Sequence, residues 1–216
     1  SLATCKPQIR NIAQPGDWIA GWGSRFLCGR GRNQESLVYL AQVKEVMTMA
    51  EYWSAHPEKR VPKAYLGRTD EPQCLGDNIY QPNGQNGYIQ QLNNNHYIYD
   101  APRDLRSKNV IICDTFYYFP VVKDNGKVIS DLSLGIEDAM RLVNNMSVGL
   151  RYSYDEAKNK DLIEFAKKEF EQRLKRSGYK TREDYILSIR FPQGLGNIRT
   201  GRGCSRKKSS CSIQGK

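Results

Sequence analysis

The sequence predicts an α+β fold, and two observations support this. Residues 17–130 hold short β-branched and aromatic runs separated by turn signals, which indicate strands, whereas residues 151–190 show helical spacing. This order of strands first and helices later is typical of α+β proteins. We therefore expect an α+β core domain over residues 1–150 with peripheral helices, a helical extension packed on the core over 151–190, and a basic flexible tail over 191–216.

The first elements follow from turn and helix-start signals. A helix is expected over Lys6–Ala13, because a proline stands where the first helical residue belongs. Pro15 and Gly16 then supply the fixed and the positive φ of a type II turn. One strand is predicted at Asp17–Gly21 and a longer one at Leu37–Val46, joined by a Gly- and Arg-rich loop.

A second helix is signalled by a capping box. Thr48 can cap it and Glu51 can reach back, and Pro57 stops it after about His56. The stretch 57–108 contains Pro, Gly and many Asn and Gln with little periodicity. A long irregular stretch of this kind is usually a binding loop or disordered.

Further strands are expected in the middle of the chain. Val110–Asp114 is apolar and continues into the aromatic run Phe116–Phe119, which predicts a central strand. Asp-Asn-Gly between two apolar pairs predicts a hairpin over Val121–Ile129. Gly135–Asn145 has the spacing of a short helix.

The last third is predicted to be helical. Ser153 and Glu156 form a second capping box, and Gly178 is the residue expected just past the end of that helix. Thr181 is expected to cap one more helix that runs to about Ile189. The apolar residues of the longer helix share one face, namely Ile163, Ala166, Phe170 and Leu174.

The net charge of +10 is concentrated near the C-terminus. Residues 1–150 carry 16 Lys and Arg against 15 Asp and Glu, whereas residues 151–216 carry 17 against 8. This asymmetry suits a phosphate-rich partner such as DNA, RNA or a free nucleotide, although a solvated basic tail has the same composition. The candidate phosphate-binding residues are Arg199, Arg202, Arg206, Lys207 and Lys208.

The cysteines and histidines predict neither a metal site nor a cofactor. The six cysteines are scattered without a CxxC pair, and His56 and His96 are the two histidines. The apolar runs are too short to span a bilayer, so no membrane association is expected. No signal-peptide pattern precedes residue 20, which predicts reduced cysteines and a cytoplasmic location.

The stretch QPGDWIAGWGS is the first candidate for a binding surface. Glycines on both sides of Trp22 leave the strand open to a close approach by another group. Asp17, Trp18 and Ser24 are the further candidates here for contacting a base. The alternative is purely structural: glycines at a bend, with tryptophans in the core.

Three more candidates for base binding lie elsewhere. Asn78 in Gly-Asp-Asn-Ile-Tyr offers a donor and an acceptor for a base edge, with Tyr80 beside it, although Gly-Asp-Asn is also ordinary turn chemistry. Tyr117 shares a strand face with Phe119 and provides either a stacking platform or core.

His96 is the candidate catalytic base, because the ordinary pKa of histidine lies near neutrality. Asp100 or Asp114 is a candidate to orient it, and the catalytic set considered is His96 with Asp77 and Asp114. The alternative is a solvated loop histidine. Neither a phosphate-binding P-loop nor the zinc-deaminase signature is present.

Several motifs resemble those of a bacterial and phage family, the second of the nucleotide modification associated domains. They cover about residues 2–120 and include SLATCKPQIRNIAQPGDWIAGWGS, LVYLAQVKEV, EYW, GDNIY and VIICDTFYYFP. Members carry further residues before the segment that matches Leu2, which implies a first strand ahead of this sequence. The resemblance implies a role associated with nucleotide modification.

The turn, acid and strand pattern is also similar to PUA-like domains, which read modified bases. This similarity implies a small mixed, barrel-like β-sheet that cups a flipped base.

Three functions follow in order of preference: a nucleic-acid or nucleotide-binding protein that recognises a modified base, an enzyme that acts on a nucleotide or base, and an interaction component of a phage-defence or modification cluster.

Overall fold

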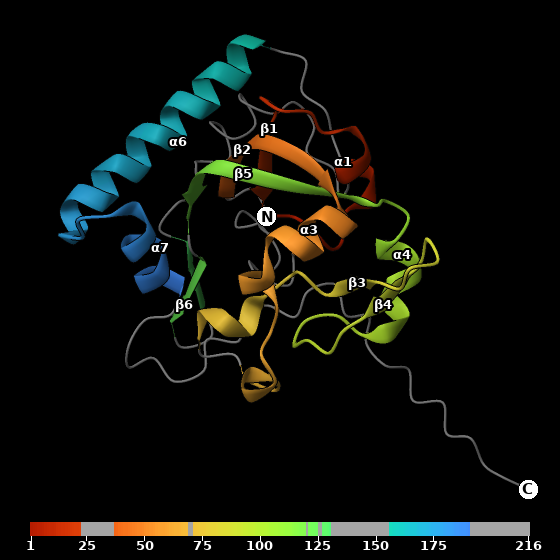
Figure 1. Ribbon diagram of the computed structural model, residues 1–216. Coiled ribbons are helices and arrows are strands. Elements are labelled where there is room, and N and C mark those ends of the chain that lie inside the picture. Colours follow the sequence, from red (N-terminus) through yellow and green to blue (C-terminus); the bar gives the residue numbers. More distant parts are fainter. Residues whose placement is uncertain (23–36, 69–70, 120, 125–126, 131–155, 191–216) are drawn as a thin grey trace, which may run out of the picture.

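The computed structural model describes residues 1–22, 37–68, 71–119, 121–124, 127–130 and 156–190. It is a mixed α+β structure, as the sequence predicts. Its main sheet is antiparallel with the strand order β1-β2-β5, formed by Trp18–Trp22, Leu37–Thr48 and Asn109–Tyr118 (Figure 1). A short bridge from Leu2 to Ile111 adds the start of the chain to β5.

The remaining described strands form two separate hairpins. Strands β3 (Tyr80–Pro82) and β4 (Tyr88–Gln90) pair with each other, as do β6 (Val121–Asp124) and β7 (Lys127–Ser130), which confirms the hairpin predicted from Asp-Asn-Gly. Every pairing among the described strands is antiparallel, and no closed barrel is found there. A three-stranded sheet is too narrow to close on itself, since small barrels need about five to eight strands.

The turn that leads into β1 forms as predicted. The Asp17 N–H donates to the Gln14 carbonyl at 3.1 Å, and Gly16 has a φ of 97°. That φ favours glycine, because a Cβ atom is strained in the left-handed region. The Asp17 carboxylate also accepts a hydrogen bond from the Gln14 N–H at 2.8 Å, so this acid closes the turn.

Helices α1 (Pro7–Ile12) and α3 (Met49–Ala55) begin where the sequence indicates. Pro7 occupies the first turn of α1. Both bonds of the capping box are made at α3, since the Glu51 N–H donates to Thr48 Oγ1 at 3.2 Å and the Thr48 N–H donates to Glu51 Oε2 at 2.7 Å. The helices described in the loop-dominated region that follows are short, and they are η2 (Pro57–Lys59), η3 (Lys63–Tyr65), η4 (Pro72–Leu75), η5 (Ile98–Asp100) and α4 (Ala101–Asp104).

Helix α6 (Glu156–Ser177) lies beside the main sheet, and α7 (Arg182–Arg190) turns back next to it (Figure 1). Ala166 and Phe170 of the predicted apolar face are fully buried, and Phe170 meets the rings of Tyr117 and Phe119 edge-on. The Asp184 N–H donates to Thr181 Oγ1 at 3.1 Å, which confirms the cap of α7. The predicted helix at 135–145, the Ser153 cap and the basic tail at 191–216 lie outside the described residues.

A second core lies under α3 and positions the candidate site. It contains Ala3, Met49, Tyr52, Ile79, Tyr80 and Val110. Because these residues come from the N-terminal segment, α3, the start of β3 and β5, they hold the first residues of the chain against the 57–108 region. No helix in the described part of the chain is long and apolar enough to cross a membrane.

Candidate active site

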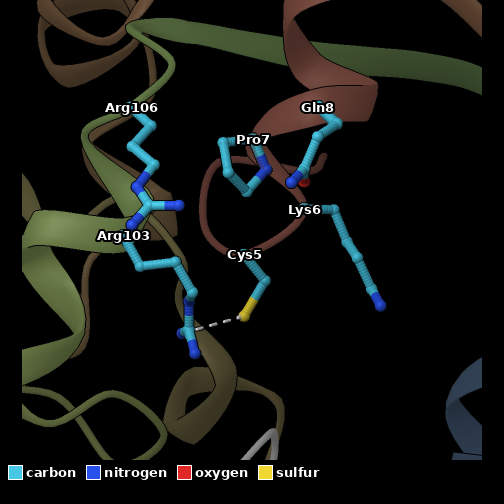
Figure 2. Close-up of a pocket in the computed structure, with 6 residues that line it drawn as sticks. All are labelled: Cys5, Lys6, Pro7, Gln8, Arg103 and Arg106. Carbon is cyan, nitrogen blue, oxygen red and sulfur yellow. Dashed lines mark hydrogen bonds between the residues drawn. The ribbon is translucent and has the colours of Figure 1, made fainter. Parts of the chain in front are cut away.

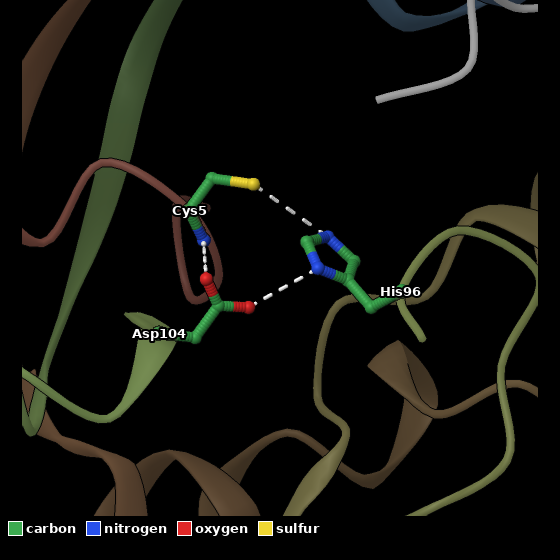
Figure 3. A group of neighbouring side chains, drawn as sticks. All are labelled: Cys5, His96 and Asp104. Carbon is green, nitrogen blue, oxygen red and sulfur yellow. Dashed lines mark hydrogen bonds and ion pairs between the residues drawn. The ribbon is translucent and has the colours of Figure 1, made fainter. Parts of the chain in front are cut away.

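Three side chains from segments far apart in the sequence converge at the end of the N-terminal segment (Figure 3). The Cys5 Sγ atom lies 3.9 Å from Nε2 of His96, and Nδ1 of His96 lies 3.1 Å from Oδ2 of Asp104. A thiol, an imidazole and a carboxylate in this order form the arrangement of a cysteine nucleophile, its base and the group that orients the base. Catalytic contacts are often this loose when no substrate is bound.

Asp104 is the buried centre of the site. Its side chain is fully buried, and its two oxygens accept hydrogen bonds from the Cys5 N–H at 3.1 Å and from the Tyr80 hydroxyl at 3.0 Å. Burial alone raises the pKa of Asp104, but the contacts with His96, Tyr80 and Arg103 outweigh it and lower that pKa below its ordinary value. Asp104 therefore stays ionised and faces His96 as a carboxylate.

Asparagine side chains fix the loop that carries His96. Asn93 Oδ1 accepts the His96 N–H at 2.6 Å, and the amide nitrogens of Asn93 and Gln90 donate to the His96 carbonyl at 3.1 and 3.2 Å. Asparagine is suited to such turns because its short side chain bonds the backbone a few residues away. The polar run around His96 thus holds the imidazole in place.

The His96 imidazole is held in its charged form. Burial lowers the pKa of His96, but the contacts with Asp104 and Cys5 outweigh burial and raise it to about 9. Nδ1 faces Asp104 as an ion pair, although its N–H is not aligned well enough with an oxygen for a good hydrogen bond. Nε2 faces the thiol, so an imidazolium at this position can give a proton to a leaving group.

Stability is expected to fall as the pH rises through the His96 titration. The folded pKa of about 9 lies above the ordinary value of 6.5, so the charged imidazolium stabilises the fold fully below about pH 6.5 and loses this effect as the pH passes about 9. The melting temperature measured across this range should therefore decline more steeply for the natural chain than for His96→Gln. His56→Gln removes the other histidine and serves as the control; parallel curves for His96→Gln and the natural chain contradict the ion pair.

The backbone at Cys5 is strained. Cys5 and Lys6 have φ values of 57° and 43°, in the left-handed region that non-glycine residues rarely adopt. The turn connects the extended segment at Leu2 to helix α1, and the Arg10 guanidinium holds it by donating from Nε to the Cys5 carbonyl at 3.0 Å. Strain of this kind concentrates at functional sites, and a nucleophile on a sharp turn into a helix is a known example.

An open pocket of about 220 Å³ adjoins the cysteine (Figure 2). The Arg103 guanidinium lies at one side, with Nη2 3.8 Å from the Cys5 Sγ. The lining residues are Cys5, Lys6, Pro7, Gln8, Arg103 and Arg106. Three of these six side chains are cationic, so the pocket attracts anions.

The same three side chains are the candidates for holding a metal ion among the described residues. One ligand atom from each of Cys5, His96 and Asp104 lies within 4.8 Å of the others. The imidazole, however, turns Nδ1 to Asp104 and Nε2 to Cys5, so its two ring nitrogens face different partners. The Arg103 guanidinium beside the sulfur also opposes a cation. The geometry therefore favours proton transfer between these groups over metal coordination.

The structure gives His96 an acid different from the predicted ones. The Asp77 carboxylate lies against the first residues of the chain instead. It accepts hydrogen bonds from the Tyr52 hydroxyl at 2.6 Å and the Ser1 hydroxyl at 2.9 Å. Asp114 is exposed on β5, and Asp100 forms an ion pair with Arg103. Neither Asp77 nor Asp114 contacts His96, because the loop carrying the imidazole packs on α4 and brings Asp104 to it.

The residues predicted to bind a base have other surroundings. Asn78 is buried, and its amide nitrogen donates to the carbonyls of Tyr52 at 3.0 Å and His56 at 2.8 Å, which completes the end of α3. Trp18 stacks on the buried Tyr117 in the core beside α6. Asp17 closes its turn, and the Tyr80 hydroxyl holds Asp104. The Trp22 side chain, Ser24, Arg199, Arg202, Arg206, Lys207 and Lys208 lie outside the described residues.

Cys5, Arg103 and Asp104 are the site residues that sequence reasoning missed. Cys5 was one of six scattered cysteines, and it lies 91 positions from its partner His96. One local signal was present, because a cysteine just before a proline-initiated helix stands where the chain turns sharply. The described cysteines Cys5, Cys74 and Cys113 form no disulfide with one another.

Comparison with protein families matches residues 1–175 to the family described as nucleotide modification associated domain 2. The match is longer than the motifs at residues 2–120 suggest, and it covers the three site residues and most of α6. No curated protein and no solved structure matches the chain. Since the match covers most of the 216 residues, the chain belongs to the nucleotide modification associated domain 2 family and is associated with nucleotide modification.

Proposed function

We propose that this protein is a thiol-dependent enzyme that acts on a nucleotide or a nucleic-acid base. Cys5 is the nucleophile, His96 carries the proton and Asp104 orients His96. The observation that supports this most strongly is the geometry of the two ring nitrogens, since Nε2 faces the Cys5 sulfur and Nδ1 faces the carboxylate. The family association with nucleotide modification supports the substrate class.

The proposed reaction proceeds in two balanced steps. The Cys5 sulfur attacks an electrophilic carbon of the substrate as the thiolate paired with the charged His96 imidazolium, so that an S–C bond forms. The imidazolium gives its proton to the leaving group as the bond between that group and the carbon breaks. In the second step water or an acceptor amine attacks the same carbon, the now neutral His96 takes the proton of the attacking group, and the S–C bond breaks, which restores the Cys5 thiolate and the His96 imidazolium.

The surroundings of Cys5 differ from those of a structural cysteine. Cys74 is fully buried, whereas Cys5 is half-buried and lines an open pocket. Reactive cysteines lie in electropositive, partly exposed surroundings, and Cys5 has the His96 ring and the Arg103 guanidinium within 4 Å.

The alternative function is recognition of a modified base without any reaction. A protein that only recognises a base has no need of side chains that activate a thiol.

Alkylation by iodoacetamide tests the proposal without a known substrate. At neutral pH we expect Cys5 to react at least about tenfold faster than Cys74 or Cys113, because its sulfur has two cationic side chains within 4 Å. The rate for each cysteine is measured by peptide mass spectrometry. His96→Gln should remove most of the advantage, and His56→Gln is the matched control. A Cys5 rate equal to that of Cys113, or unchanged in His96→Gln, would overturn the proposal.

A further inference from the structure

An exposed apolar surface lies next to the candidate active site. Leu92 and Ile98 are 76% and 80% exposed, and the rings of Tyr97 and Tyr99 are stacked on each other with centroids 5.0 Å apart at 11°. Tyr97 is 47% exposed and Tyr99 is 65% exposed. Together with Ile89, these residues form what we call the tyrosine patch. Large side chains of this kind, gathered along one short segment, mark interaction sites.

The tyrosine patch and the catalytic groups share one continuous segment. His96 directly precedes Tyr97, and the Tyr97 N–H donates to Asp100 Oδ2 at 3.0 Å. Asp100 in turn pairs with Arg103 at 3.2 Å, and Arg103 lines the pocket at Cys5. The patch therefore adjoins the pocket through η5 and α4.

The pocket supplies the charge that the tyrosine patch lacks. Lys6 and Arg106 are exposed, and with Arg103 they place three cations around the opening (Figure 2). Its volume of about 220 Å³ is below the 300–1,000 Å³ of ordinary small-molecule sites, so it suits one anionic group better than a whole nucleotide. The rest of such a ligand has to lie outside, where the tyrosine rings are.

We propose that the pocket and the tyrosine patch form one binding site for single-stranded nucleic acid. A backbone phosphate binds among Lys6, Arg103 and Arg106, and a base stacks on Tyr99. Stacking on aromatic rings beside a cationic groove is the usual way that proteins hold unpaired strands. A strand fits better than a mononucleotide, because Leu92 and Ile89, earlier in the same segment, are also exposed. This inference rests on the proposed function in one respect, namely that the strand bound beside Cys5 is the substrate of the proposed reaction.

Fluorescence anisotropy with a labelled oligothymidine of about 12 nucleotides, a length within the range of single-strand sites, tests this inference. All variants are made on the full Cys5→Ser chain, so that no ligand is turned over, in about 0.15 M salt. Tyr99→Ala should weaken binding roughly tenfold through the lost stacking. Arg106→Ala should weaken binding severalfold and reduce the slope of log affinity against log salt by about 0.7.

Matched controls lie on the helical side of the molecule. Tyr179→Ala removes another exposed tyrosine, and Lys168→Ala removes an exposed cation of α6; both should bind as the Cys5→Ser parent does. Equal binding by Tyr99→Ala and Tyr179→Ala overturns the inference. A blunt duplex that competes as well as the single strand also overturns the inference. So does thymidine monophosphate that competes equally well, because this result identifies a free nucleotide as the ligand.

The binding assay and the alkylation assay can fail separately. Selective alkylation of Cys5 together with binding that is unaffected by Tyr99→Ala contradicts only the single-strand site. Binding that depends on Tyr99 and Arg106, together with an unreactive Cys5, contradicts only the thiol chemistry and indicates a reader of unpaired bases.

Discussion

Replacing Cys5 with alanine is expected to reduce nucleotide modification by at least about 10³-fold, the scale of loss when a nucleophile is removed from a triad. In the proposed reaction, neither His96 nor Asp104 can replace the sulfur in forming the S–C bond. The measurement is mass spectrometry of nucleosides from cells that carry the modification system with the natural chain or with Cys5→Ala. The expected result is a modified nucleoside that is present in the first culture and missing from the second.

Cys113→Ala is the control for this experiment, since it removes a half-buried thiol on β5. It should leave the modified nucleoside at its normal level. Immunoblots and melting curves must show that Cys5→Ala is present and folded. If a folded Cys5→Ala chain supports the same amount of modified nucleoside, the thiol has no chemical role. The site then serves recognition, which is the function that sequence alone ranks first.

The predictions that succeed are those that depend on neighbouring residues. The capping box at Thr48 and the turn at Pro15–Gly16 both form, because each is closed by hydrogen bonds within three residues along the chain. The β6–β7 hairpin forms for the same reason. A barrel, in contrast, requires distant strands to meet, and the described strands pair in three separate antiparallel sheets.

The candidate site depends on contacts that no local pattern reveals. His96 was found as a candidate because one loop histidine with acids nearby is conspicuous. Its partners Cys5 and Asp104 were not, because Cys5 is brought to His96 by long-range contacts, namely the bridge from Leu2 to Ile111 and the packing of Ala3 in the second core. The stretch 57–108 shows little periodicity because side-chain amides, such as those of Asn78 and Asn93, organise much of it through bonds to backbone carbonyls.

Replacing Arg10 with methionine is expected to destabilise the fold by about 3–5 kcal/mol, the cost of breaking a buried charged network. Arg10 is fully buried, although it lies on the short helix α1. Its guanidinium donates to four carbonyls, those of Cys5 at 3.0 Å, Ser107 at 3.0 Å, Asn109 at 2.6 Å and Asp104. Methionine fills similar space but leaves these acceptors without a partner in the interior.

Urea unfolding measures this loss as a lower midpoint at unchanged slope. Arg176→Met is the matched control: Arg176 is 69% exposed and pairs loosely with Glu169, so its loss should cost at most about 1 kcal/mol. Arg10→Lys keeps the charge, but lysine lacks the planar fork and cannot bond four carbonyls. Its loss of unfolding free energy should therefore lie between those of Arg10→Met and Arg176→Met. A cost below about 1 kcal/mol for Arg10→Met contradicts a central role for this network.

Arg10 also connects stability to the candidate chemistry. Its bonds to the Cys5 and Asp104 carbonyls tie the strained turn at Cys5 to the helix that carries the buried acid. When that tie is lost, Cys5 and Lys6 can relax from their positive φ values, and the thiol moves away from His96. Arg10→Met should therefore lose the selective alkylation of Cys5 at temperatures where it is still folded, whereas Arg176→Met should keep it. Selective alkylation in a folded Arg10→Met chain shows that the turn does not need this support.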